Sequence, residues 1–268
     1  IYADASQWSE LVWVLEQKLE IASSSRNRVA LLIRLAQIET EEFVKLDEAI
    51  ERLSKAIEIE PRNTRAHERL IELLRRQQKW NELAEALERF AMAERTEEQQ
   101  VRRLAEAAAV QRDELSLPAE AVALLRRASK IAPNDPVVLG MLAEALVAST
   151  EPAQAFDVYL QQAEATAEPK DKAAAYVAAA TLARDTLLRR KEALELLEQA
   201  IALDPSLSAA ASSLRADRMA EGDWDGAARA LEAEIAQAAG PNQRGQLLLD
   251  LGKLYRKQLR RDNDALLA

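Results

Sequence analysis

Apolar residues recur along this chain at the spacing of an α-helix. Within residues 29–38, for example, Leu32, Leu35 and Ala36 fall on one face. Glycine and proline are scarce, with 6 and 8 residues in a chain of 268. The whole pattern predicts about fifteen helices. We expect loops at residues 23–27, 95–98, 168–171 and 240–243, with shorter turns at the prolines.

The chain repeats itself every 72 residues. Pro61, Pro133 and Pro205 follow this spacing, and so do small and apolar residues such as Ala49, Ala121, Ala193 and Ala265. Trp8, Trp80 and Trp224 follow it too, and Pro152 takes the fourth position of that series. Such a period indicates a repeat protein. The predicted blocks are residues 8–79, 80–151, 152–223 and the partial block 224–268.

Each block divides into two helical hairpins of unequal length, at about residues 28–63 and 64–97 in the first full case, near the roughly 34-residue period of tetratricopeptide repeats. Residues 47–63 read DEAIERLSKAIEIEPRN and residues 191–207 read KEALELLEQAIALDPSL. Both resemble the second helix and closing proline of a repeat of the tetratricopeptide family. The longer hairpins depart from the family because their turns, at residues 42–45 and 187–190, lack glycine.

The resemblance implies an all-α fold, an α-solenoid of antiparallel helical hairpins with a right-handed superhelix. We expect residues 1–268 to form one such solenoid. Trp8 would begin the second helix of a hairpin, and the last block stops soon after a second helix begins. We therefore expect the chain to be a segment of a longer protein.

Composition narrows the chemistry. The chain has no cysteine and one histidine, so cysteine chemistry and histidine-cluster metal sites are excluded. No phosphate-binding loop or hydrolase motif occurs, and we expect no enzymatic activity, no cofactor and no metal. The net charge of −9 disfavours nucleic-acid binding. No apolar run reaches bilayer length, so direct membrane insertion is not expected. The compartment stays open between cytoplasm and periplasm.

Candidate binding residues follow from the family resemblance. In such arrays the first helices of the hairpins line a concave groove that receives a peptide or a partner helix. The groove-facing positions of this chain would be Arg65, Glu68, Glu72, Arg75, Arg102, Arg112, Arg184, Lys253 and Arg256. Arginine suits such a surface because its planar fork binds carboxylates with two hydrogen bonds. His67 lies at helical spacing from Leu70 and Leu74, which indicates packing rather than catalysis.

Trp13 is a separate candidate. Glu85, Asp157 and Arg229 stand at the matching positions of the other blocks, and all three are polar. An aromatic residue at a position that is otherwise solvated predicts contact with an upstream hairpin or a partner, although a lone exposed aromatic residue is also common.

The function expected from this pattern is a scaffold or adaptor in a larger, bacterial assembly, which binds a peptide, helix or partner domain. One alternative is a structural repeat protein that self-assembles. A further alternative is a non-catalytic segment of a larger enzyme or regulator.

The register of the repeat can be tested at a small residue. Replacing Ala49 with tryptophan would force two helices apart, and overpacking of this kind costs about 1–3 kcal/mol or more. We expect a clear fall in the melting temperature of Ala49→Trp, measured by circular dichroism. A variant that melts like the parent would show that the register is wrong.

Overall fold

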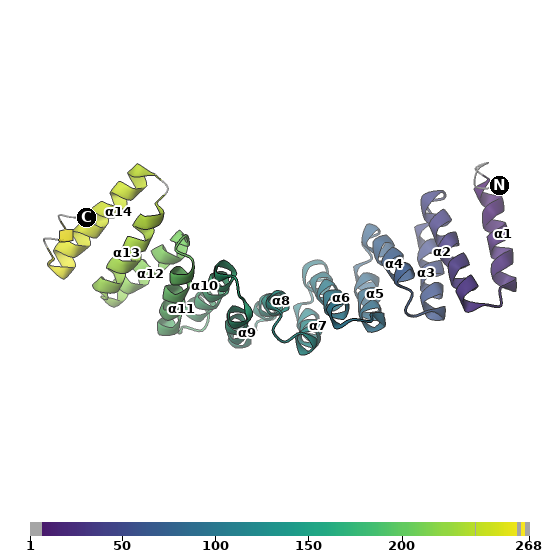
Figure 1. Ribbon diagram of the computed structural model, residues 1–268, viewed down its shortest axis with the longest axis horizontal. Coiled ribbons are helices and arrows are strands. Elements are labelled where there is room, and N and C mark those ends of the chain that lie inside the picture. Colours follow the sequence, from purple (N-terminus) through teal and green to yellow (C-terminus); the bar gives the residue numbers. More distant parts are fainter. Residues whose placement is uncertain (1–6, 239, 262–263, 266–268) are drawn as a thin grey trace. The chain divides into compact units, whose positions relative to one another are not determined.

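The computed structural model describes residues 7–238, 240–261 and 264–265, which fold into fourteen α-helices and two short π-helical segments without any strand. The chain forms two compact units, Ile1–Pro133 and Asn134–Ala268. In each unit, helices that follow one another along the chain pack against one another (Figure 1). The predicted fold class, an all-α stack of antiparallel helical hairpins, is therefore confirmed within each unit.

The first unit contains seven α-helices and one π-helical segment. They are α1 (Trp8–Ile21), α2 (Ser25–Glu41), α3 (Leu46–Ile59), α4 (Thr64–Arg76), α5 (Trp80–Ala93), α6 (Glu97–Ala109), η1 (Val110–Glu114) and α7 (Pro118–Ile131). The first helices of its hairpins are α2, α4 and α6, and the second helices are α1, α3, α5 and α7.

The second unit has the same alternation. It contains α8 (Pro136–Ala148), α9 (Pro152–Ala165), α10 (Pro169–Asp185), α11 (Arg190–Leu203), α12 (Ser208–Glu221), α13 (Trp224–Gln237), α14 (Pro241–Leu254) and η2 (Tyr255–Leu259). Here α8, α10, α12 and α14 are the first helices. Equivalent helices begin 72 residues apart, as at Trp8, Trp80, Pro152 and Trp224. That residues 1–268 form one continuous right-handed superhelix stays a prediction.

The four predicted loops extend too far into the helices that follow them. Helices α2, α6, α10 and α14 begin at Ser25, Glu97, Pro169 and Pro241, inside the ranges predicted as loop. Proline at a first helical position has its backbone angle preset and loses no hydrogen bond. Thr96 caps α6, since its hydroxyl oxygen accepts a hydrogen bond from the Gln99 N–H at 3.3 Å. Residues typical of loops here start helices.

Small residues let the helices approach closely. Ala49, Ala56, Ala121, Ala128, Ala193 and Ala200 are at most 1% exposed. Leu53, Leu125 and Leu197 are buried one turn from them. Because every hairpin presents these residues to its neighbour, the apolar core runs through each stack from helix to helix.

Two buried carboxylates bridge neighbouring helices. Glu39 of α2 accepts a hydrogen bond from the Nε of Arg52 on α3 at 3.2 Å, and Arg52 also pairs with Glu16 of α1. Burial raises the pKa of Glu39, and the charge of Arg52 opposes this rise. In the second unit, Glu234 of α13 accepts a hydrogen bond from Arg215 Nε of α12 at 2.7 Å.

The hairpin turns place residues other than glycine in the left-handed region. In the longer hairpins Val44, Ser116 and Leu188 have φ near +55°, and the turn closes with a hydrogen bond from Lys45 N–H to Glu39 O at 2.8 Å. In the shorter hairpins Gln78 and Thr150 are left-handed, and Lys79 N–H donates to Leu74 O at 3.0 Å. The longer turn spans one residue more, which agrees with the extra residue of these hairpins.

Val44 offers a test of backbone strain, because left-handed geometry costs a non-glycine residue about 1–2 kcal/mol. Glycine loses about 0.5–1 kcal/mol more conformational entropy on folding. We therefore expect Val44→Gly to be neutral or to raise the free energy of unfolding by up to about 1 kcal/mol.

The matched control is Gly222→Ala. Gly222 has φ of 76°, and an added Cβ would meet nothing within 4 Å, so the change acts on the backbone alone. It should lower stability by about 1 kcal/mol. Urea denaturation of both variants measures these shifts, and a clear loss of stability in Val44→Gly would contradict the interpretation.

Candidate functional site

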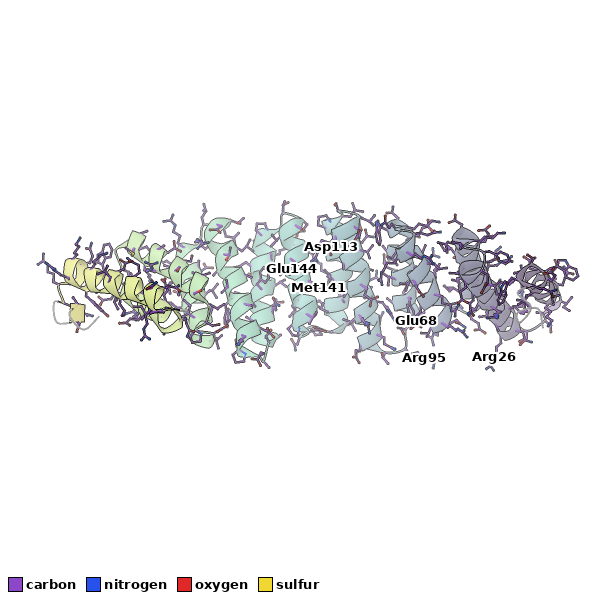
Figure 2. All side chains as sticks on the ribbon, turned by 90° about the horizontal axis from the view of Figure 1, so that it is seen from above. Arg26, Glu68, Arg95, Asp113, Met141 and Glu144 are labelled. Carbon is purple, nitrogen blue, oxygen red and sulfur yellow. The ribbon has the colours of Figure 1, made fainter. Side chains whose placement is uncertain are left out.

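Four of the predicted binding residues form one exposed stripe on α4. Arg65, Glu68, Glu72 and Arg75 follow each other at spacings of three and four residues, and all are exposed. In Figure 2, Arg26 and Arg95 lie along one edge of the first unit and Asp113 along the other, with Glu68 between them. Because α2, α4 and α6 all begin at the edge of Arg26 and Arg95, their first-helix faces lie side by side.

Two further predicted residues on this face pair within the chain. Arg102 of α6 is exposed, and its Nε lies 3.2 Å from Glu106 Oε1. Arg112 is half-buried in η1, and its Nε lies 3.3 Å or less from a carboxylate, at 2.7 Å from Asp113 Oδ1. Surface ion pairs of this kind contribute little to stability and exchange readily. That these residues together form a partner-binding groove stays a prediction.

A groove of about 480 Å³ lies between α2 and α4, over Leu53 of α3. Glu72 lines it with Arg69 and Arg76 of the same helix, and Thr40 and Glu41 of α2 form the other wall. Of these residues only Glu72 was predicted. The prediction missed Arg69 and Arg76 because the position of the groove depends on α2, which periodicity in α4 does not reveal.

The predicted residues of the second unit lie on two separate helices. Arg184 of α10 is half-buried, with Asp185 at 2.7 Å and Asp217 of α12 at 3.6 Å. Lys253 of α14 pairs with Asp250 at 3.1 Å and lines a pocket of about 330 Å³ with Arg215 and Met219. Arg256 is exposed in η2. Only Lys253 and Arg256 are neighbours.

A groove of about 370 Å³ between α8 and α10 was not predicted. Its lining includes Val137 and Glu144 of α8, Tyr159 of α9 and Asp171 of α10. Glu144 and Met141 mark α8 in Figure 2. Burial raises the pKa of Tyr159, and the nearby carboxylate of Glu144 adds to the rise. The phenol therefore stays neutral at physiological pH.

Trp13 is exposed on α1, with 63% of its surface accessible. Its register counterparts Glu85, Asp157 and Arg229 are exposed as well, so the position faces solvent in every block. The role of Trp13 as an anchor stays a prediction. Trp8, Trp80 and Trp224 are half-buried at the first positions of α1, α5 and α13.

The α3–α5 groove lies between two second helices of the first unit and has a volume of about 540 Å³. Its floor is formed by α4 and its walls by α3, by the turn that follows α3, and by α5. The lining residues are Ile50, Ser54, Ile57, Glu58, Pro61, Arg62, His67, Leu70, Leu74, Glu82, Glu85, Ala86, Arg89, Met92 and Ala93. The available signal was Met92, which aligns with Glu20, Glu164 and Ala236.

His67 lies buried under this groove, in agreement with its predicted packing role. Its Nε2 lies 2.9 Å from the carbonyl oxygen of Pro61, and its ring stacks on Phe90 with centroids 4.6 Å apart. The guanidinium of Arg103 lies 4.4 Å from the Phe90 centroid and pairs with Glu94 at 3.3 Å. Burial lowers the pKa of His67, and the hydrogen bond to Pro61 opposes this effect.

Two general features bear on chemistry. Across the described part of the chain, no group of three or more histidine, cysteine, aspartate or glutamate side chains is arranged to hold a metal ion. None of the described helices combines the length and the apolar character that crossing a bilayer requires.

Known structures of similar architecture include three with the following overlaps. YrrB, described as a TPR protein with an unusual peptide-binding site, is 19% identical with a TM-score of 0.47, over 68% of this chain and 90% of YrrB. A double mutant of MamA RS-1 is 20% identical with a TM-score of 0.49, over 65% of this chain and 96% of MamA. Yeast Tom70 is 16% identical with a TM-score of 0.45, over 98% of this chain and 61% of Tom70.

No protein-family model matches the sequence, and no curated protein matches it. At these identities the likeness concerns the fold alone. The helical hairpins and the recurring helix starts are those of a tetratricopeptide-like repeat protein, as the sequence resemblance predicted.

The buried imidazole predicts a pH dependence of stability. Since the pKa of His67 is lowered in the folded state, the unfolded chain binds a proton that the folded chain does not as the pH falls below 6.5. His67 should therefore reduce stability on acidification, by at most about 1.4 kcal/mol per pH unit.

The matched variant is His67→Leu, since Leu139 stands at the equivalent position of the next block. Its free energy of unfolding, measured in urea between pH 7.5 and 5, should fall less steeply with acid than that of the parent. Equal slopes would show that His67 does not titrate differently on folding.

Proposed function

We propose that this chain is a protein-interaction scaffold that binds a peptide, helix or partner domain within a larger assembly. The observation that supports this most directly is the exposed charged stripe of α4 beside the α2–α4 groove. No ion pair joins Arg65, Glu68, Glu72 or Arg75 to another described residue. These charges are available to a partner whose own charges complement them.

The stacked fold supports this role energetically. The apolar residues under α4, such as Leu70 and Leu74, are buried against neighbouring helices, so the charged stripe is presented on a preformed surface. A partner then binds without ordering this part of the chain, which reduces the entropic cost of association. Arginine and glutamate alternate along the stripe, and such a pattern selects a partner by register as well as by net charge.

The partner proposed here is a protein or peptide and not a nucleic acid, because the chain carries a net charge of −9. Catalysis is not part of the proposal. Self-association, a role as a non-catalytic segment of a larger enzyme, a bacterial origin and a place in the cytoplasm or periplasm stay predictions.

Charge reversal tests the first-helix surface. We expect Arg75→Glu, Arg102→Glu and Arg112→Glu together to weaken binding of a partner identified by crosslinking mass spectrometry. The loss should be about tenfold or more, because charge-assisted hydrogen bonds would be replaced by repulsion. Binding is measured by titration calorimetry, and circular dichroism verifies that the helical content is retained.

A control with the same change in net charge carries Lys18→Glu, Lys45→Glu and Lys130→Glu, which are exposed away from the first helices. This control should bind nearly like the parent. If both triple variants bind equally, the first-helix surface is not the binding surface.

A further inference from the structure

The α3–α5 groove has an apolar interior and a charged rim. Ile50 and Ile57 of α3 face Leu70 and Leu74 of α4 across it, and Met92 of α5 stands at its edge with 64% of its surface accessible. Methionine adapts its shape easily and is common at surfaces that bind helices. The rim carries Glu58, Arg62, Glu82, Glu85 and Arg89.

The second unit shows that the repeat does not produce this groove automatically. Two blocks further along the sequence, Glu198 and Arg218 stand at the positions of Ser54 and Leu74. Their side chains pair at 2.6 Å and occupy the space between α11 and α12. The open apolar groove of the first unit thus depends on its small Ser54 and its uncharged Leu74.

The charged rim is also specific to the first unit. Ala202, Ser206 and Ala233 stand where Glu58, Arg62 and Arg89 stand in the groove. Charges around an apolar floor give a surface both affinity and specificity, because the floor buries apolar side chains and the rim orients them. The second unit lacks both features at these positions.

The dimensions of the groove fit a helix of about three turns. Its lining on α5 runs from Glu82 to Ala93, which at 1.5 Å per residue is about 16 Å. The lining residues of α3 and α4 recur at helical spacings, for example Ile50, Ser54 and Ile57. A groove between two helices with such walls accepts the apolar stripe of a third helix at positions i, i+3 or i+4, and i+7.

The rim charges are separated along the groove. Glu82 and Glu85 lie in the first half of α5, whereas Arg89 lies in its second half and Arg62 follows the end of α3. Arg62 forms no ion pair with another described residue, and Arg89 has only an exposed pair with Glu85 at 3.5 Å. One end of the groove is therefore acidic and the other basic.

We propose that the α3–α5 groove binds an amphipathic helix of a protein partner, with acidic residues in its first turn and basic residues in its last turn. The acidic end lies over Arg62 and Arg89, and the basic end lies over Glu82 and Glu85. The macrodipole of the bound helix favours this distribution of charge. The helix then runs antiparallel to α3 and α5. This surface is distinct from the first-helix surface proposed above.

A pair of synthetic peptides tests the proposal. Both have 14 residues with leucines at positions 4, 7 and 11, and one carries three glutamates at its start and three lysines at its end. The other has these charges exchanged. Fluorescence anisotropy of the labelled peptides should show that the parent protein binds the first at least tenfold more tightly than the second.

Exchanged charges also weaken the helix of the second peptide itself, so the protein is varied as well. The variant Glu82→Lys, Glu85→Lys, Arg62→Glu, Arg89→Glu should reverse the preference or reduce it at least tenfold. An unchanged preference would overturn the assignment of the groove. Failure of the parent to bind either peptide at millimolar concentration would overturn it too.

The decisive variant closes the groove with the ion pair of the second unit. Ser54→Glu with Leu74→Arg should reduce peptide affinity at least tenfold while the helical content stays constant. If this variant does not fold, Met92→Glu serves in its place, with Met219→Glu as the matched control at an exposed methionine of the second unit. Parent-like affinity in the groove variant contradicts the proposal.

Two further outcomes separate the alternatives. Light scattering that shows a dimer of the parent, dissociated by Met92→Glu, would assign the groove to a second copy of this chain and overturn the proposal. The variant Arg75→Glu, Arg102→Glu, Arg112→Glu should bind the first peptide like the parent. Failure of the groove and failure of the first-helix surface are therefore distinguishable.

Discussion

Close packing between successive helices is the interaction on which the rest of this structure depends. A single hairpin cannot bury its apolar stripe, so every helix relies on its neighbours in the stack. Ala49, Ala56 and their counterparts are almost fully buried because a larger side chain would separate the helices. Once these stripes face each other, the remaining faces of the helices are left to solvent, and both candidate binding surfaces lie on those faces.

The backbone repeats more faithfully than the side chains, and the differences distinguish the two units. The buried pair of Glu39 and Arg52 corresponds to Ala183 and Leu196 two blocks later, and Ser54 and Leu74 correspond to Glu198 and Arg218. A buried ion pair is weak evidence for stability, because desolvation offsets much of its attraction. These exchanges therefore alter the surface and the polarity of a helix contact while the hairpin fold is retained.

The stack of His67, Phe90 and Arg103 connects the two surfaces of the first unit. His67 supports the floor of the α3–α5 groove, and Arg103 lies on α6 beside Arg102. Glu106 accepts hydrogen bonds from both arginines. The two surfaces thus share one packed set of side chains, which holds each in place when the other is occupied.

The sequence by itself determined the helical hairpins, the small residues at their contacts and the exposed charges of α4, because each follows from periodicity within a single helix. The tertiary structure alone decided where the α3–α5 groove opens and which charges border it, since residues from Ile50 to Ala93 on three helices meet there. It also decided that Val44 and Thr150 take left-handed geometry, because the packing of the flanking helices imposes the path of the turn. Periodicity identifies the buried face of a helix, but not the space left between two helices that both pack on a third.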